Sequence, residues 1–178
     1  MAPQVTIREA TVDDAEAISD VHAAAIREEG SEGYTDRQVE AWLANVHPER
    51  YPLEEDGFQI VVAEREGDDG DGGDPIGFGL LDCEPPDVDD DRTGQIGAVY
   101  VHPDHAREGV GTAILTDLES AAREAGLETL VLTASRNAIG FYEQRGYEGV
   151  ETVSLEMSDD VALACLRMRT RLKDGPSR

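Results

Sequence analysis

Two glycines separate a strand-like run from a helical run in the middle of this 178-residue chain. Residues 94–102 alternate as a strand does, and the apolar residues of 109–125 recur at helical spacing. The predicted helix begins at Gly109-Val110-Gly111-Thr112, where the first N–H groups lack intrahelical partners and carry partial positive charge. Because glycine has no Cβ, a phosphate could approach this backbone closely. The pattern predicts a diphosphate site, although a tight strand-to-helix turn without a ligand would use the same glycines.

A second motif makes the prediction specific, because the glycines alone lack the further signals of a dinucleotide fingerprint or a P-loop. NAIGFYEQRGYEGV, residues 137–150, follows the next predicted strand. Together with AVYVHPDHAREGVGTAIL, residues 98–115, it resembles the paired motifs of the GNAT superfamily of N-acetyltransferases. The order of predicted elements from Val5 to Leu172 is similar to that family as well.

The resemblance implies transfer of an acetyl group from acetyl-CoA to a primary amine. Backbone N–H groups from Arg107 to Thr112 would hold the diphosphate, and the pantetheine arm would lie along the preceding strand. Asn137 would bond the pantetheine from the far side, and Tyr142 would protonate the leaving thiolate as a general acid. The implied contacts with the cofactor are those of Val99, Tyr100, Val101, Arg107, Glu108, Gly109, Val110, Gly111, Thr112, Asn137, Phe141 and Tyr142.

The group that accepts the proton of the amine is unassigned. An alkyl ammonium has a pKa of ~10.4, so the amine must lose a proton before it attacks the thioester. Many family members carry an acid in the middle of the fourth strand, where this chain has Gly97-Ala98. The backbone N–H of Val101 is expected to bind the carbonyl oxygen. The candidates for the base, besides a water-mediated route, are His22, Glu32, His102 and His105.

Several of these residues also have purely structural interpretations. Tyr142 could be a core aromatic residue, and Asn137 could cap the helix that it precedes. The stretch GYTDRQVEAW, residues 33–42, is similar to a GNAT segment that borders the acceptor pocket, so Tyr34 and Trp42 are candidate acceptor contacts. Trp42 also fits the apolar stripe of a helix, which favours a core anchor, and Tyr34 is the better candidate of the two.

The periodicity predicts an α/β fold, more narrowly an α+β mixed sheet, with the order β-α-α-β-β-β-α-β-α-β-β. We expect one domain over residues 1–178 with a core from about 5 to 172, and the family resemblance implies splayed central strands at 94–102 and 128–133. The segment 29–35 is expected to be a loop. The other predicted strands are 4–9, 58–64, 75–83, 147–157 and 161–172, and the predicted helices are 12–28, 36–46, 109–125 and 137–145.

The charge is strongly acidic, with thirty-nine Asp and Glu against fifteen Lys and Arg, for a net charge of −24. Such a surface repels nucleic acid. The acids are spread along the chain, which favours a salt-adapted surface over an acidic docking site for a cationic partner. Two segments, 64–74 and 84–93, are expected to be acidic loops. A metal site is an alternative for the first segment, but the segment lacks the calcium-loop pattern, which favours a solvated loop.

The remaining signals are weaker. No signal peptide or membrane span is evident, so a cytoplasmic location is expected. Cys83 and Cys165 lie in apolar runs and are expected to be buried free thiols. The last two strands could form a homodimer. Two rival functions remain: a GNAT-fold protein that binds CoA without catalysis, and an acidic interaction or regulatory module.

Overall fold

The computed structural model describes residues 5–66, 72–86, 88, 90–106 and 108–172. Their strands form one mixed seven-stranded sheet in the order β1-β2-β3-β4-β5-β7-β6. All neighbours are antiparallel except β4 and β5, which are parallel. The strands are β1 (Val5–Glu9), β2 (Phe58–Glu66), β3 (Gly72–Asp82), β4 (Thr93–Val101), β5 (Thr129–Ala134), β6 (Glu148–Ser158) and β7 (Val161–Arg171).

The expected order of helices and strands is confirmed, and short 3-10 segments are added at η1 (Val12–Asp14), η2 (Pro48–Arg50) and η3 (Pro103–His105). None of the helices in the described ranges is long and apolar enough to cross a membrane. The α-helices are α1 (Ala15–Gly33), α2 (Asp36–Leu43), α3 (Val110–Glu124) and α4 (Ile139–Gln144).

The prediction of a loop from Glu29 to Thr35 is wrong, because α1 continues to Gly33. Gly30 lies inside the helix and allows α2 to pack closely: a Cβ at Gly30 would lie only 2.6 Å from Val39 Cγ2. Thr35 then starts α2, with its hydroxyl accepting a hydrogen bond from the N–H of Gln38 at 3.2 Å. The extra turn carries Glu29 along the same face as the buried part of α1.

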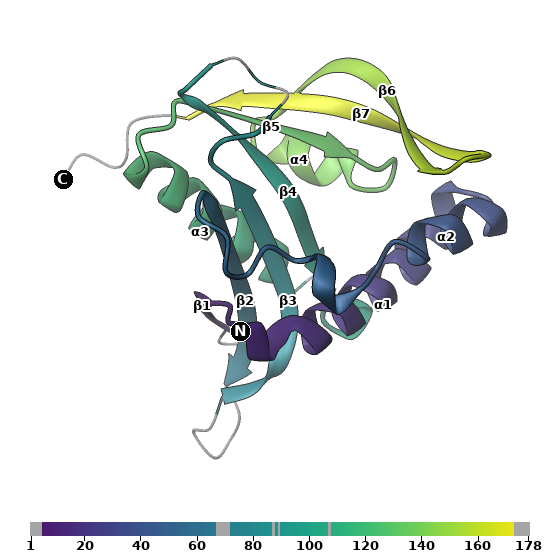
Figure 1. Ribbon diagram of the computed structural model, residues 1–178, viewed down its shortest axis with the longest axis horizontal. Coiled ribbons are helices and arrows are strands. Elements are labelled where there is room, and N and C mark those ends of the chain that lie inside the picture. The colour runs from purple at the N-terminus through teal and green to yellow at the C-terminus, as the bar shows by residue number, and fades with distance from the viewer. Residues whose placement is uncertain (1–4, 67–71, 87, 89, 107, 173–178) are drawn as a thin grey trace.

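The helices cover both faces of the sheet, as Figure 1 shows. Alternate side chains of β2 point to opposite sides, as expected for a strand. Val61 and Ala63 pack in the cluster that contains α3, whereas Ile60 and Val62 pack in the cluster that contains the start of α1. The central strands are therefore packed on both faces, against α3 on one side and against the start of α1 on the other.

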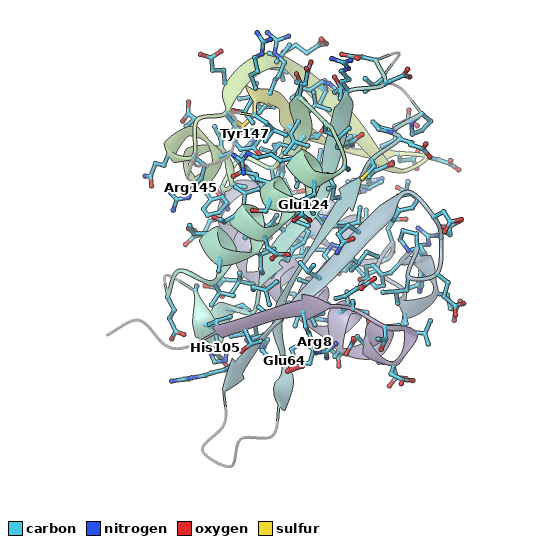
Figure 2. All side chains as sticks on the ribbon, turned by 90° about the vertical axis from the view of Figure 1, so that its left-hand side faces the viewer. Arg8, Glu64, His105, Glu124, Arg145 and Tyr147 are labelled. Atoms are coloured by element: carbon cyan, nitrogen blue, oxygen red, sulfur yellow. The ribbon has the colours of Figure 1, made fainter. Side chains whose placement is uncertain are left out.

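A partly buried contact between Arg8 and two carboxylates, those of Asp14 and Glu64, anchors the first strand. Arg8 on β1 donates two hydrogen bonds of 2.8 Å to the Asp14 carboxylate and a third to Glu64 on β2, which lies beside it in Figure 2. This contact lowers the pKa of Asp14. Asp14 also accepts from the backbone N–H of Thr11 at 2.8 Å, as the acid of a capping box does.

The predictions for the two cysteines and for the first acidic loop are only partly confirmed. Both cysteines are free thiols; Cys165 is buried, whereas Cys83 is half-buried. The first acidic loop is shorter than predicted, because β2 continues to Glu66 and β3 begins at Gly72. The middle of that loop, residues 67–71, lies outside the described residues.

Candidate active site

The strands β4 and β5 separate at a β-bulge. Leu81 pairs with Ile96 and Leu80 with Ala98, so Gly97 is the extra residue on β4. The parallel pairing of β4 with β5 also ends at Ile96 (Figure 1). A Cβ at Gly97 would lie 2.7 Å from Leu80 Cδ2, so a carboxylate side chain at this position would displace Leu80. The bulge therefore explains the splay that was expected between these strands.

Beyond the bulge, β4 offers an unpaired edge. The N–H of His102 donates to Ile76 on β3 at 2.8 Å. Because backbone groups alternate along a strand, those of Val101 and Val99 point the other way, toward the opening. Their side chains line a cleft, whereas the Tyr100 side chain packs on the opposite face against Phe78. Val99 and Val101 of this predicted trio therefore line the cleft, whereas Tyr100 does not, because its side chain lies on the opposite face and its backbone groups alternate toward β3.

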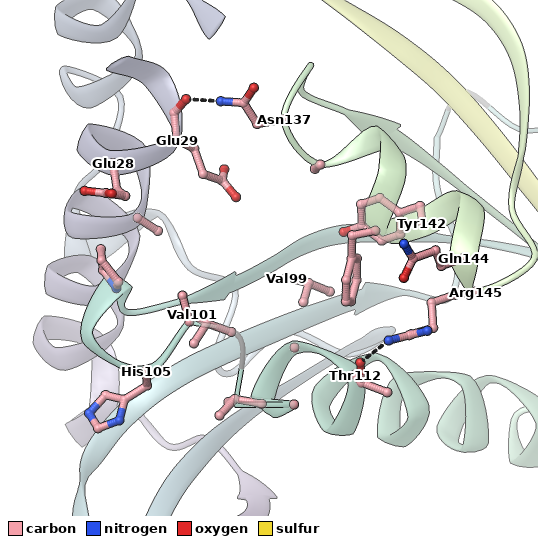
Figure 3. A pocket seen from close by; sticks show the side chains of 18 of the residues that line it. Glu28, Glu29, Val99, Val101, His105, Thr112, Asn137, Tyr142, Gln144 and Arg145 are labelled. Carbon is pink, nitrogen blue, oxygen red and sulfur yellow. Dashed lines mark hydrogen bonds between the residues drawn. The ribbon is translucent and has the colours of Figure 1, made fainter. Parts of the chain in front are cut away.

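The cleft has a volume of about 920 Å³ and lies between α1, β4, η3, the start of α3 and α4. Figure 3 shows carboxylates on its α1 wall and an arginine on the opposite wall. The cleft therefore offers cationic and N–H groups on one side only. Nine of the residues predicted to contact the cofactor line it: Val99, Val101, Gly109, Val110, Gly111, Thr112, Asn137, Phe141 and Tyr142.

The start of α3 has the geometry that an anion requires. Gly109 has φ +85°, in the left-handed region that favours glycine. The first bond of the helix joins the N–H of Ala113 to the carbonyl of Gly109 at 3.1 Å. The N–H groups of Val110, Gly111 and Thr112 precede that bond, so they are free to face the cleft.

Arg145, which the sequence analysis did not single out, adds a positive charge at this point. Its guanidinium donates to Thr112 Oγ1 at 2.6 Å and lies 5.3 Å from the centre of the Phe141 ring (Figure 3). Arg145 lies inside the second sequence motif, three residues after Tyr142. Arg145 lies next to the start of α3 only because the chain folds α4 near that helix. The spacing of residues in the sequence therefore did not indicate a role for Arg145.

Another member of the predicted phosphate loop is placed differently. Glu108 does not line the cleft; its Oε1 lies 3.4 Å from His105 Nδ1. Arg107 lies outside the described residues.

Tyr142 lies between the cleft and the core. The residue is only 6 % exposed, and burial raises the pKa of its hydroxyl, with a further contribution from Glu29. Its ring packs edge-on against Phe141 and Tyr147. Within the described ranges, the Tyr142 hydroxyl forms no hydrogen bond, whereas that of Tyr147 donates to Glu119 at 2.9 Å. Tyr142 thus combines a core ring with a protonated, unengaged hydroxyl.

Asn137 lines the cleft but does not cap a helix. The cap position of α4 is Ala138, and no side chain bonds there. The Asn137 amide instead donates to the backbone carbonyl of Glu29 (Figure 3). The interpretation of Asn137 as a helix cap is therefore wrong, because its amide ties the segment before α4 to α1.

A narrow slot of about 40 Å³ lies next to the cleft, where the two strands separate. Its walls include Glu29, Val99 and Tyr142 from the cleft side and Gly97, Thr133 and Ser135 from the far side. On the far side lies a chamber of about 300 Å³. The chamber walls are largely apolar or aromatic, and none is a carboxylate: His22, Trp42, Gln95, Ile96, Gly97, Ala98, Tyr100, Thr133, Ser135, Leu155, Met157, Leu163 and Cys165.

The two predicted acceptor contacts differ in position. Trp42 is buried and lines the chamber. Tyr34 lines none of the three cavities. Its hydroxyl donates to the carbonyl of Ala164 at 2.8 Å and accepts from the N–H of Arg136 at 3.1 Å, while its ring meets Trp42 edge-on. Trp42 is therefore the one that the structure places at a cavity wall.

The four candidate bases are scattered. His22 lines the chamber and accepts or donates a hydrogen bond to Tyr51 at 2.9 Å; burial lowers the pKa of His22 to about 4. Glu32 and His105 line the outer cleft. His102 caps η3 and lines none of the three cavities, with its Nδ1 accepting from the N–H of Asp104 at 3.1 Å.

Glu29 is a further acidic residue at the centre of the site, and the sequence analysis missed it. It lines both the cleft and the slot. The signal was present as spacing: Glu29 follows Ala25 and Ile26 by four and three residues on the apolar face of α1. Assigning residue 29 to a loop hid that pattern.

Comparison with known proteins identifies the class. The model of the acetyltransferase (GNAT) family matches residues 22–147. The chain belongs to this family, which confirms the resemblance inferred from the two motifs.

Individual relatives are distant. An uncharacterized N-acetyltransferase of Methanocaldococcus jannaschii is 27 % identical over 152 residues, which cover 83 % of this chain but 62 % of that protein. A GCN5-related N-acetyltransferase structure from Rhodopseudomonas palustris is 27 % identical, has a TM-score of 0.78, and is matched over 97 % of both chains. A Salmonella typhimurium acetyltransferase, solved with acetyl-CoA, is 21 % identical with a TM-score of 0.65, covering 97 % of this chain and 96 % of that one. At that identity the last comparison shows a shared fold.

Proposed function

We propose that this protein transfers an acetyl group directly from acetyl-CoA to a primary amine. The observation that carries the proposal is the passage through the sheet. The cleft at the start of α3, the slot where β4 and β5 separate, and the chamber on the other face lie in sequence, because the slot shares wall residues with both of the others. Two substrates entering from opposite faces would meet in the slot, and that proximity favours direct transfer.

The cleft suits an anionic, elongated acetyl donor. The N–H groups of Val110, Gly111 and Thr112, together with Arg145, would hold the diphosphate. The free edge of β4 at Val99 and Val101 would pair with the amides of the pantetheine, and Phe141 would pack beside it. When bound, acetyl-CoA would supply an activated thioester carbonyl. The solved Salmonella typhimurium neighbour with acetyl-CoA supports this assignment by fold.

Two groups of this chain would act on the reacting atoms. The backbone N–H of Val101 or Val99 would donate to the carbonyl oxygen as negative charge develops there. The Tyr142 hydroxyl, kept protonated by its raised pKa, would donate its proton to the departing thiolate. No covalent intermediate with the protein is needed.

The chamber suits an amine that is attached to an uncharged, apolar body. Its walls include Trp42, Tyr100 and Leu163, and the residues that line it include no carboxylate to pair with a second cationic group. Burial of a charged group without a partner is costly, so polycationic acceptors would bind poorly there. The many acidic residues elsewhere on the protein do not supply a carboxylate to the chamber walls.

Replacing Tyr142 with Phe tests the proposal. We expect turnover of acetyl-CoA with an active amine to fall about 100-fold, as for loss of a general acid, while the Kd for acetyl-CoA changes little. Tyr147→Phe is the matched control, because it removes a hydroxyl from the neighbouring ring that bonds Glu119 rather than facing the cleft. Equal turnover in Tyr142→Phe and wild type would contradict the acid role. Acetyl-CoA binding without thiol release in any amine panel would support the non-catalytic alternative.

A further inference from the structure

Glu29 lies where the cleft adjoins the slot between β4 and β5. It belongs to the walls of both cavities, as do Val99, Ala138 and Tyr142. Among these four residues, Glu29 alone has a side chain that can accept a proton at neutral pH. Figure 3 shows its carboxylate pointing from α1 into the cleft.

The carboxylate is held in place without being neutralised. The Asn137 amide bonds the backbone carbonyl of Glu29, which fixes this turn of α1 against the segment before α4. Within the part of the chain that is described, no hydrogen bond or ion pair engages the side-chain oxygens. A carboxylate with free lone pairs at a substrate passage is chemically available.

The surroundings of Glu29 favour proton uptake. Burial raises the pKa of Glu29 from 4.5 to about 7. Burial raises the pKa of the hydroxyls of Tyr100 on β4 and Tyr142 on α4, and the nearby charge of Glu29 raises both pKa values further. The other charged or titratable residues on the cleft walls are Glu28 and Glu32 of α1, His105 of η3, and Arg145 after α4.

The competing groups are less well placed. Glu32 and His105 line the cleft but not the slot, and His102 lines neither. His22 lines the chamber, but burial lowers its pKa to about 4, which makes it a weak proton acceptor. Gly97 and Ala98 have no titratable side chain.

We propose that Glu29 is the proton acceptor for the attacking amine, an assignment that rests on the proposed function. Glu29 removes one proton from the ammonium group and releases it to solvent through the open cleft. The nitrogen lone pair then forms the C–N bond to the acetyl carbon as the C–S bond breaks. The nitrogen sheds its second proton through Glu29, and the thiolate receives one from Tyr142. The proton held by Glu29 restores the Tyr142 hydroxyl, so the amide, the free thiol and one solvent proton balance the reaction.

Glu29→Gln keeps the size of the side chain and removes the basic oxygen, so it tests the assignment. Thiol release is followed with 2-phenylethylamine, whose aromatic body suits the chamber, and with aniline, which is uncharged at neutral pH. For the alkylamine we expect kcat/KM to fall about 100-fold at about pH 7, with a smaller defect as the pH approaches the amine pKa of ~10. With aniline the defect should be several-fold smaller, and the Kd for acetyl-CoA should be unchanged.

Asp20→Asn is the matched control, since Asp20 is an exposed carboxylate on the same helix outside the three cavities. A second readout needs no turnover: the carboxyl carbon of Glu29, identified by its absence in Glu29→Gln, should titrate in ¹³C NMR with a pKa of about 7.

Each outcome separates this assignment from the proposed function. Three results in an active wild-type protein would overturn the role of Glu29 and leave the proposed function standing. They are equal activity of Glu29→Gln and wild type, an equal defect of Glu29→Gln with both amines, and titration of Glu29 near the ordinary glutamate value. Acetyl-CoA binding by the wild type without thiol release from any amine would overturn both.

Discussion

Replacing Glu29 with Gln should stabilise the fold at alkaline pH and leave its stability nearly unchanged in acid. Because burial raises the pKa of this carboxyl from 4.5 to about 7, the folded protein holds its proton more tightly than the unfolded chain does. Below the lower value the group is neutral in both states. As the pH rises between the two values, the unfolded chain releases its proton first, so wild-type stability falls until the native carboxyl also ionises above about 7.

The magnitude follows from the same two values. A tenfold change in proton affinity corresponds to ~1.4 kcal/mol, so a rise from 4.5 to about 7 corresponds to about 3 kcal/mol. We therefore expect Glu29→Gln to gain up to about 3 kcal/mol in the free energy of unfolding at about pH 8.5, relative to its difference from wild type at about pH 4. Any constant cost of burying the Gln amide cancels in that comparison.

Urea unfolding at fixed KCl concentration measures this difference, with the fluorescence of Trp42, the single tryptophan, as the signal. Asp20→Asn corrects for the general effect of removing one negative charge from a chain of net charge −24. A stability difference between Glu29→Gln and wild type that does not change with pH would refute the burial argument. So would a pH-dependent gain of the same size in Asp20→Asn.

Three further predictions concern the cleft and the surface. Arg145→Met removes the charge beside Thr112 and should raise the Kd for acetyl-CoA about tenfold by calorimetry, with kcat nearly unchanged; a strongly lowered kcat at unchanged Kd would contradict the phosphate role. Gly111 lines the cleft at the start of α3, so the branched side chain in Gly111→Val would occupy space beside the proposed diphosphate site and should weaken acetyl-CoA binding at least tenfold, whereas Gly140→Val, outside the cleft walls, should not. Molar KCl should raise the melting temperature, since salt screens the repulsion behind a net charge of −24; a melting temperature equal in dilute buffer would exclude this.

Local chemistry accounts for what could be predicted from the sequence. A helix that starts at a glycine turn and a strand that alternates are properties of neighbouring residues, so the order of elements and the start of α3 followed from spacing. Gly109 adopts the left-handed φ that glycine permits, which agrees with the predicted turn. The second motif, including Phe141 and Tyr142, lies where the family resemblance implied. Errors appeared at boundaries, above all at the end of α1.

Long-range packing decided the rest. Glycine often follows the end of a helix, but Gly30 lies within α1 and allows α2 to pack against it, so Glu29 is helical. Asn137 and Glu29 are 108 residues apart in sequence, and Arg145 and Thr112 are 33 apart. The amino-acid sequence by itself determined the glycine turn at the start of α3 and the position of Tyr142 in the helix of the second motif, because both depend on adjacent residues. Only the tertiary structure decided that Glu29 faces Tyr142 across the slot, because that requires α1, β4 and α4 to converge.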